Sequence, residues 1–256
     1  MNLIRAELLK VRTTPLWRNF GLLLFLLWSV TLAFNWVNSA VLPPEEALGV
    51  TVDLATTGQF FGILIVLLLG AVMVTGEFLH LTITTTFLIT PRRERVVLAK
   101  FAAAVLIALV VWAALTVLNL IAIPLVTADL GMSGRLGAAE VWQAIGLNGV
   151  AFALWAVLGV GCGVLFRGQM AATLTLAILY VLGPPVATGL FFLIDGRVDG
   201  FAELDFLVPT VASDLMITGS ELPTGPGRLT GAAVLVAYTL VTGVVGALLM
   251  RRRDIA

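Results

Sequence analysis

Six long apolar segments constrain this chain more strongly than any other feature of its sequence. A bilayer core about 30 Å thick is crossed by a helix of roughly 20 apolar residues. The segments are Phe20–Val37, Phe60–Thr75, Leu98–Val126, Trp142–Phe166, Met170–Ile194 and Leu229–Met250. The second is short, and we expect it to begin near Thr57. The pattern predicts an all-α polytopic membrane protein with six transmembrane helices, forming a single transmembrane domain over residues 1–256.

The composition excludes several classes of soluble protein. Hydrophobic residues make up 60% of the 256 residues and charged residues 12%, whereas a soluble domain carries about 25% charged residues. So few charges cannot coat a surface that faces water on all sides. We therefore exclude a soluble enzyme, a nucleic-acid binder and a disordered protein, and we expect membrane lipid but no nucleic acid as a partner.

The net charge is zero, but the charges divide unequally between the two sets of connecting segments. With the N-terminus in the cytoplasm, the inner segments and helix ends hold 12 of the 15 basic residues and 4 of the 15 acidic residues. The inner side then carries +8 and the outer side −8. Because Lys and Arg collect on the cytoplasmic side, we expect both termini inside. Cleavage of the first segment as a signal peptide would leave five helices and place a basic segment outside.

The most informative segment follows the second apolar run and precedes the third. It contains Gly76-Glu77, Thr82-Ile83, Thr84-Thr85-Thr86-Phe87 and Thr90-Pro91-Arg92-Arg93, and it leads to Lys100. The stretch 81–89 is half threonine and too short to cross a bilayer. An apolar but polar-spotted stretch of this kind is expected to lie on the membrane surface or to dock against another protein.

This segment resembles the ABC-2 type permease family, the membrane subunits of ATP-binding-cassette exporters. The resemblance is carried by Gly76-Glu77, Thr82-Ile83, Thr90-Pro91-Arg92-Arg93 and Lys100, and the chain length and six spans agree with it. His80-Leu81 departs from the family, in which glycine is common before the threonine. The resemblance implies an ATPase-coupling segment made of Glu77, Thr82, Thr84, Thr85, Thr86, Phe87, Thr90, Pro91, Arg92 and Arg93. It also implies two separate ATPase subunits, which carry ATP and Mg, and a second permease that is a copy or a related chain.

The chain itself lacks the sequence of a P-loop. That loop requires Gly-Lys followed by Ser or Thr, but the two lysines, Lys10 and Lys100, follow Leu9 and Ala99. The sequence has one cysteine, Cys162, and one histidine, His80. We therefore expect no enzyme activity, no catalytic residue, no metal site and no cofactor on this chain, with the ATPase activity on a partner.

The middles of the six spans are free of charged residues in the sequence, which argues against a proton-driven carrier. Four amides enter the spans, and they either pack helices together or line a pathway: Asn35, Gln59, Asn119 and Asn148. A pathway without fixed charge favours hydrophobic or amphipathic cargo, such as a drug, a lipid or a peptide. Gly159 and Gly163, with Gly161 between them, have the spacing that lets helices approach closely.

Three further elements can be read from local pattern. Ile4, Leu8 and Val11 form one face of an amphipathic N-terminal helix, which either anchors the chain at the inner interface or, as the resemblance implies, contacts the ATPase. Pro184-Pro185 predict a bend, or a hinge, in the fifth span. The last outer loop is acidic, which indicates either solvated charge or a cation or substrate gate, and the resemblance implies short re-entrant helices within it, with breaks at Pro209 and Gly219.

The sequence thus favours the permease of an ATP-driven exporter in a bacterial inner (plasma) membrane. A non-transporting membrane anchor or assembly subunit is one alternative, and co-purification with an ATPase would distinguish it. A secondary carrier or a membrane-embedded enzyme is the other. A carrier can be recognised by testing whether transport stops when ATP is depleted or when an uncoupler is added.

Overall fold

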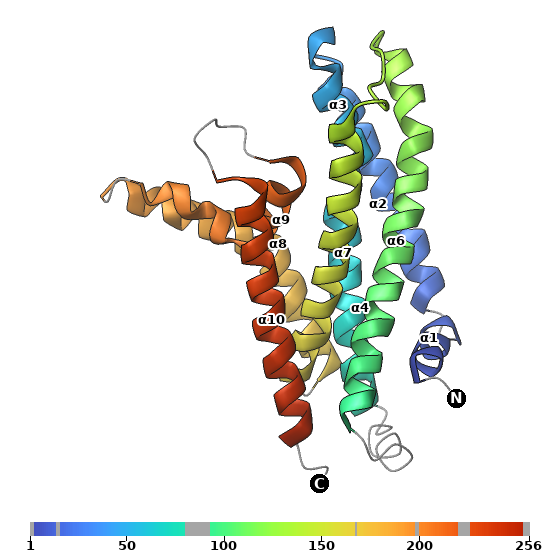
Figure 1. Cartoon of the computed structure of the whole chain (residues 1–256), viewed down its shortest axis with the longest axis vertical. Helices are drawn as coiled ribbons and strands as arrows, with labels where there is room; N and C mark the ends of the chain where they lie inside the picture. The colour runs from blue at the N-terminus through green and yellow to red at the C-terminus, as the bar shows by residue number, and fades with distance from the viewer. Residues whose placement is uncertain are drawn as a thin grey trace.

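The structure is a computed structural model that describes residues 3–13, 16–79, 93–166, 168–197, 200–219 and 226–252. Within these ranges, every regular element is a helix (Figure 1). In chain order they are α1 (Leu3–Thr13), α2 (Leu16–Ser39), the 3₁₀ helix η1 (Pro44–Glu46), α3 (Ala47–Ala55), α4 (Gln59–Leu79), α6 (Arg93–Asp129), α7 (Ala139–Leu165), α8 (Gln169–Asp195), the 3₁₀ helix η2 (Ala202–Leu207), α9 (Pro209–Thr218) and α10 (Arg228–Arg252).

Six helical segments in the described part of the chain are long and apolar enough to cross a membrane, which confirms the number predicted. They are Arg18–Ser39, Pro44–Glu77, Arg95–Asp129, Ala139–Leu165, Gln169–Asp195 and Arg228–Leu249. Each overlaps one of the apolar segments found in the sequence. The chain is therefore compatible with a multi-pass membrane protein.

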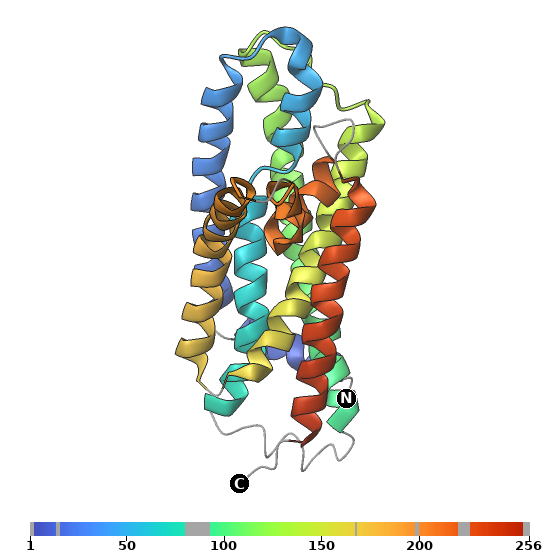
Figure 2. The ribbon, with the colours of Figure 1, turned by 90° about the vertical axis from the view of Figure 1, so that its left-hand side faces the viewer.

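The helices form a tall bundle with two distinct ends (Figures 1 and 2). One end, here called the terminal end, holds α1, the last turns of α4, the first turns of α6 and the last turns of α10. The opposite end, here called the far end, holds α3, the end of α6 and the start of α7. The two ends of the segment that resembles the permease family therefore meet the bundle beside α1.

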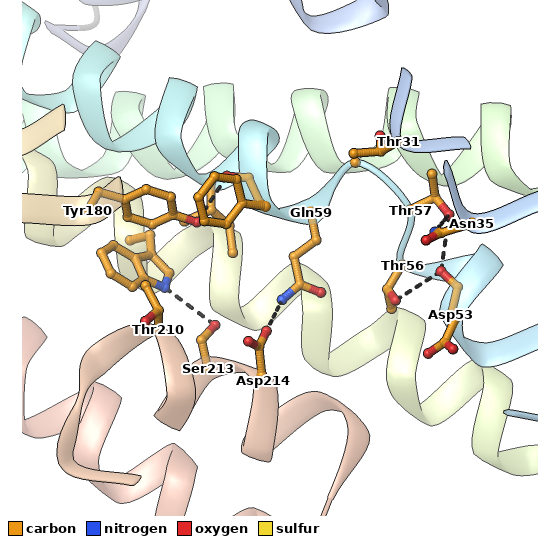
Figure 3. Close-up of a pocket in the computed structure, with 14 residues that line it drawn as sticks. Thr31, Asn35, Asp53, Thr56, Thr57, Gln59, Tyr180, Thr210, Ser213 and Asp214 are labelled. Atoms are coloured by element: carbon orange, nitrogen blue, oxygen red, sulfur yellow. Dashed lines mark hydrogen bonds between the residues drawn. The ribbon is translucent and has the colours of Figure 1, made fainter. Parts of the chain in front are cut away.

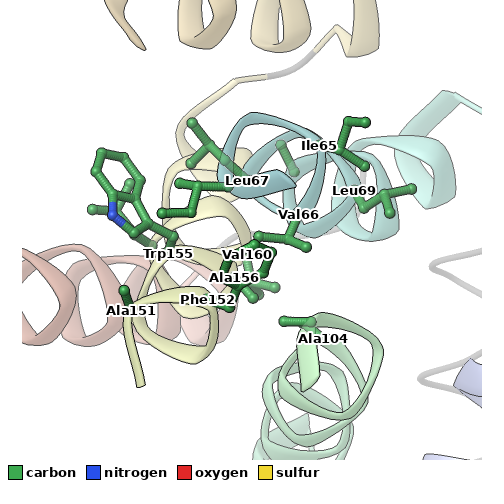
Figure 4. Close-up of a cluster of buried hydrophobic side chains, with 14 of the residues drawn as sticks. Ile65, Val66, Leu67, Leu69, Ala104, Ala151, Phe152, Trp155, Ala156 and Val160 are labelled. Atoms are coloured by element: carbon green, nitrogen blue, oxygen red, sulfur yellow. The ribbon is translucent and has the colours of Figure 1, made fainter. Parts of the chain in front are cut away.

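The centre of the bundle is formed by α4 and α7, whose facing side chains are buried (Figure 4). A Cβ atom at Gly159 would lie 2.2 Å from the Leu67 carbonyl oxygen, and one at Gly163 would lie 2.8 Å from Ala71 Cα. Only glycine permits these backbone contacts, so the predicted packing role of the glycine pair is confirmed. Such close approach matters in lipid, where apolar burial alone does not hold helices together.

The second span is preceded by a helix that the sequence pattern did not predict. α3 ends at Ala55 and α4 begins at Gln59, and Gly58 between them has a φ of 81°, which favours glycine. Asn119 of α6 donates from Nδ2 to the carbonyl oxygens of Ala55 and Thr57 at 3.0 and 3.1 Å. Because the break frees backbone carbonyls, this amide satisfies groups that would otherwise be unpaired.

The fifth span remains one helix through its two prolines. Pro184 and Pro185 lie inside α8, and its second half bends away from the bundle (Figure 1), which agrees with the predicted bend. Between α8 and α10 the chain forms η2 and α9. Pro209 begins α9, and Gly219, with a φ of 88°, ends it, so both predicted breaks are helix boundaries.

Candidate functional site

Four charged side chains from three helices form an ion-pair cluster at the terminal end. Its members are Glu7 and Lys10 of α1, Glu77 of α4 and Lys100 of α6. Lys100 Nζ lies 3.0 Å from Glu7 Oε2 and 2.7 Å from Glu77 Oε1. Lys10 Nζ lies 2.7 Å from Glu7 Oε1 and 2.6 Å from Glu77 Oε1. Each lysine therefore bridges both carboxylates, and the cluster as a whole is neutral.

Three of the four members are withdrawn from solvent. Lys100 is 1% exposed, and Glu7 and Glu77 are 6% exposed. Lys100 Nζ also donates to the Met73 carbonyl oxygen at 3.3 Å. Lys10 is the partly exposed member: burial lowers its pKa, but the hydrogen bonds from its ammonium to Glu7 and Glu77 outweigh that effect and raise the pKa above its ordinary value. Removing one partner of such a buried network leaves an uncompensated charge, which is strongly destabilising.

The cluster includes one residue of the predicted coupling segment and adds two that the sequence did not single out. Glu77 was predicted as a coupling residue and is a central member. Thr82, Thr84, Thr85, Thr86, Phe87, Thr90, Pro91 and Arg92 lie outside the described residues, and Arg93 begins α6. Glu7 and Lys10 were missed as partners because nothing in a local pattern reports a contact with a residue 67 positions away.

The N-terminal helix turns Glu7 toward the bundle, and the apolar face predicted for the membrane interface lies beside this buried side. Glu7 is its buried residue, whereas Ile4 is 36% exposed. Leu8 and Val11 line an apolar groove together with α2 and α6. The face toward the bundle is therefore centred on the ion pairs that Glu7 and Lys10 make with Lys100 and Glu77.

A second polar site lies where α2, α3, α4, α7, α8 and α9 converge (Figure 3). It is a cavity of about 260 Å³, here called the polar cavity. Its lining is Thr31, Asn35, Asp53, Thr56, Thr57, Gly58, Gln59, Phe60, Ile63, Trp155, Tyr180, Thr210, Ser213 and Asp214. The break between α3 and α4 forms one wall, so the same local interruption that Asn119 stabilises also creates the cavity.

Two of the four predicted pathway residues line the polar cavity, and the other two do not. Asn35 and Gln59 line the polar cavity, where Asn35 Nδ2 donates to Thr57 Oγ1 at 2.8 Å. Asn119 has a packing role instead, as it binds the α3–α4 break and accepts from Trp28 Nε1 at 2.7 Å. Asn148 is buried in α7 outside the cavity lining, and its Oδ1 has no hydrogen-bond partner among the described residues.

One acid of the last outer loop belongs to the polar cavity. Asp214 of α9 accepts a hydrogen bond from Gln59 Nε2 at 2.9 Å (Figure 3). Asp214 is exposed to solvent on its cavity side, and desolvation by the protein packed around its other sides raises its pKa to about 6, although the Gln59 hydrogen bond opposes the shift. Asp214 is therefore a solvent-accessible acid of the polar cavity, and both readings of the acidic loop, solvated charge and a gate, stay open.

An apolar chamber of about 560 Å³ adjoins the polar cavity. Trp155, Tyr180 and Thr210 line both spaces and form the wall between them. From there the chamber extends along α4 to Leu67 and along α7 to Cys162. The bundle thus holds a polar and an apolar compartment that share three residues.

Comparison with known proteins does not assign the chain. No family model matches the sequence, and a search of curated proteins returns no match. Among the described residues, no three His, Cys, Asp or Glu side chains gather in a way that would hold a metal ion.

Proposed function

We propose that this chain is the transmembrane permease subunit of an ATP-driven exporter and works with separate ATPase subunits. Two permeases, either copies or related chains, and two ATPases would make up the transporter, with ATP and Mg bound by the ATPases. The resemblance to the ABC-2 type permease family and the six apolar helices support this assignment.

We infer from the charge bias that both termini lie in the cytoplasm of a bacterium, and the spacing of the two polar sites is compatible with this orientation. Gln59 and Glu77 are eighteen residues apart on α4, a rise of about 27 Å along a helix. That distance is close to the roughly 30 Å thickness of a bilayer core. The ion-pair cluster and the polar cavity then lie at opposite membrane interfaces. The basic bias of the inner segments favours the cluster as the cytoplasmic one.

The ion-pair cluster is the observation that carries the proposal. The segment 80–92, which bears the family-like motif, is attached to α4 on one side and α6 on the other. Glu77 and Lys100 bind each other just inside these two attachments, and Glu7 adds α1 to the same unit. A push on the segment by a closing ATPase dimer would therefore move three helices together rather than bend one.

In this scheme η2 and α9 act as re-entrant helices of the outer leaflet. α9 packs against α7, α8 and α10, and its residues Ala212, Met216 and Ile217 are buried. With the polar cavity at the outer interface, these helices lie at the side where an exporter releases its cargo. Hydrophobic or amphipathic cargo fits the apolar lining of the neighbouring chamber.

The decisive experiment is to purify the tagged chain from its native membranes after cross-linking and to reconstitute the complex in liposomes. We expect a P-loop ATPase in equal amount and ATP hydrolysis that depends on the chain. A K100M variant, which breaks the cluster, should lower the number of substrate molecules moved per ATP. Recovery of the chain without any ATPase, from cross-linked native membranes, would contradict the proposal.

A proton-coupled secondary carrier is the second candidate, and the cluster itself favours it. Glu7 and Glu77 are buried carboxylates at the end of the second candidate span, and buried ionisable groups of transporters often carry protons. Such a carrier would stop when an uncoupler collapses the proton gradient and would continue when ATP is depleted. The exporter shows the opposite response.

A further inference from the structure

The polar cavity and the apolar chamber together have the form of a binding site for one amphipathic molecule. The chamber, at about 560 Å³, is within the range of small-molecule sites, and the polar cavity of about 260 Å³ continues it. Trp155, Tyr180 and Thr210 border both. A molecule with a compact polar head and an apolar tail can therefore occupy both compartments at once.

The charge of the polar cavity selects the head group. Asp53 and Asp214 line it, and none of its described lining residues is basic. Arg228 is the basic residue placed near α9, but it donates to the Thr218 carbonyl oxygen at 3.1 Å and to Gln143 Oε1. Asp53 and Asp214 are both exposed to solvent in the cavity, so an ammonium head there would be attracted to their carboxylates and an anionic head would be repelled.

The aromatic rings of the cavity also favour a cationic head group. Tyr180 lies between Phe60 and Trp155, with ring centroids 4.9 Å and 5.2 Å away respectively. The Tyr180 hydroxyl donates to the Phe60 carbonyl oxygen at 2.9 Å, which holds the ring in place. All three rings line the cavity. Aromatic faces attract ammonium groups, and quaternary ammonium ligands are commonly bound by such clusters.

One polar atom at the junction lacks a partner. Thr210 Oγ1 is buried and makes no hydrogen bond within the described residues. Buried hydroxyls are normally paired. The oxygen itself is closed off from the accessible space of both compartments, so it marks a local packing defect beside their shared wall and is not a ligand contact.

We propose that these two compartments bind an amphipathic organic cation, with its amine or ammonium head among Asp53, Asp214 and the aromatic rings and its apolar tail in the chamber. In the orientation argued above, the head lies at the outer interface. Leu67 is eight residues further along α4 than Gln59, so the tail reaches about 12 Å toward the bilayer centre. The molecule then stands as an outer-leaflet amphiphile does. The statements that the head lies at the outer interface and that this cation is the exported cargo rest on the proposed function, whereas the binding itself does not.

The test uses the full chain in a neutral maltoside detergent and two labelled probes with the same tail, decyltrimethylammonium and decyl sulfate. We expect saturable binding of the cation at least about tenfold tighter than that of the anion, because only the anion is repelled. The D53N/D214N variant should lose this preference. D129N is the matched control, since Asp129 lies at the end of α6, outside the cavity lining, and an amide can still accept its bond from Trp36 Nε1.

The native cysteine reports on the tail. Cys162 lines the chamber and is the only cysteine in the sequence, so bound decyltrimethylammonium should slow its alkylation by N-ethylmaleimide, whereas tetramethylammonium should not. Thermal unfolding of each variant verifies folding, and the single variants D53N and D214N replace the double one if it is unstable. Equal affinity of the native chain for both probes, or an unchanged preference in the folded variants, would overturn the inference. Because no ATPase takes part, these results stand apart from the test of the proposed function.

Discussion

Lys100 Nζ lies 2.7 Å from Glu77 Oε1, and this ion pair joins α4 to α6 immediately inside the segment that connects them. Lys100 is 1% exposed and Glu77 6% exposed. A pair so well buried is maintained by its full set of partners, here Glu7 and Lys10 on α1. The cluster therefore makes the N-terminal helix part of the unit through which the connecting segment meets the bundle.

Replacing Lys100, the buried lysine of the cluster, should lower stability much more than replacing Lys10, the half-exposed lysine. K100M leaves Glu7 and Glu77 with only Lys10, and we expect a loss of about 3–5 kcal/mol. K10Q removes the half-exposed lysine, where water replaces the lost partner, and should cost about 1 kcal/mol. Thermal unfolding of the two variants in detergent checks this order. Equal losses would mean that the burial of Lys100 does not matter.

Charged residues in place of Thr84–Phe87 should separate ATP hydrolysis from transport while the fold is retained. This stretch is the threonine-rich middle of the predicted coupling segment and lies outside the described residues, so the prediction follows from sequence. The reconstituted transporter should hydrolyse ATP but move little cargo. A control with aspartates at Ser133 and Gly137, which are exposed at the far end, should transport normally. Intact coupling in the first variant would remove the segment from the mechanism.

The glycine contact between α4 and α7 offers a matched pair of substitutions on one helix. A Cβ atom at Gly159 would lie 2.2 Å from the Leu67 carbonyl oxygen, whereas one at Gly146 has nothing within 4 Å. G159A should therefore force the helices apart and lower the melting temperature by several degrees. G146A should raise it slightly, because alanine favours a helix by up to about 1 kcal/mol. Similar changes in both variants would show that the contact is not limiting.

Binding of decyltrimethylammonium should weaken as the pH falls through about 6. Burial raises the pKa of Asp214 to about 6, so acid neutralises a carboxylate that attracts the cation, while the probe keeps its charge at every pH. Asp214 faces Gln59, Tyr180 and, across the cavity, Asp53, while Arg228 binds the end of α9. Affinity between pH 7.5 and 5 should fall toward that of D214N. A flat profile would exclude Asp214 from the head-group site.

The orientation can be measured with single cysteines in a Cys162→Ser background. Thr13 is exposed at the terminal end and Ser133 at the far end. With both termini in the cytoplasm, a membrane-impermeant maleimide added to intact cells should label S133C and leave T13C unlabelled until the cells are opened. Labelling of T13C in intact cells would reverse the orientation and place the ion-pair cluster outside.

Local sequence patterns determined the membrane spans, the ends of α9 and one helix contact. The number and approximate bounds of the spans follow from the length of apolar segments, since a bilayer core requires a fixed length of helix. Pro209 begins α9 and Gly219 ends it. Proline readily begins a helix, and glycine tolerates the left-handed backbone that ends one. The glycine pair on α7 was also readable from its spacing.

Only the tertiary structure decided which distant residues share a site. Glu7 and Lys100 pair across 93 positions, and Gln59 and Asp214 across 155. Periodicity reports the face on which a residue lies, but not the helix that will cover that face. For the same reason Asn35 and Asn119 were alike in sequence, although one lines the polar cavity and the other binds a broken helix. The sequence thus determined the spans, and packing between them determined the ion-pair cluster and the two compartments.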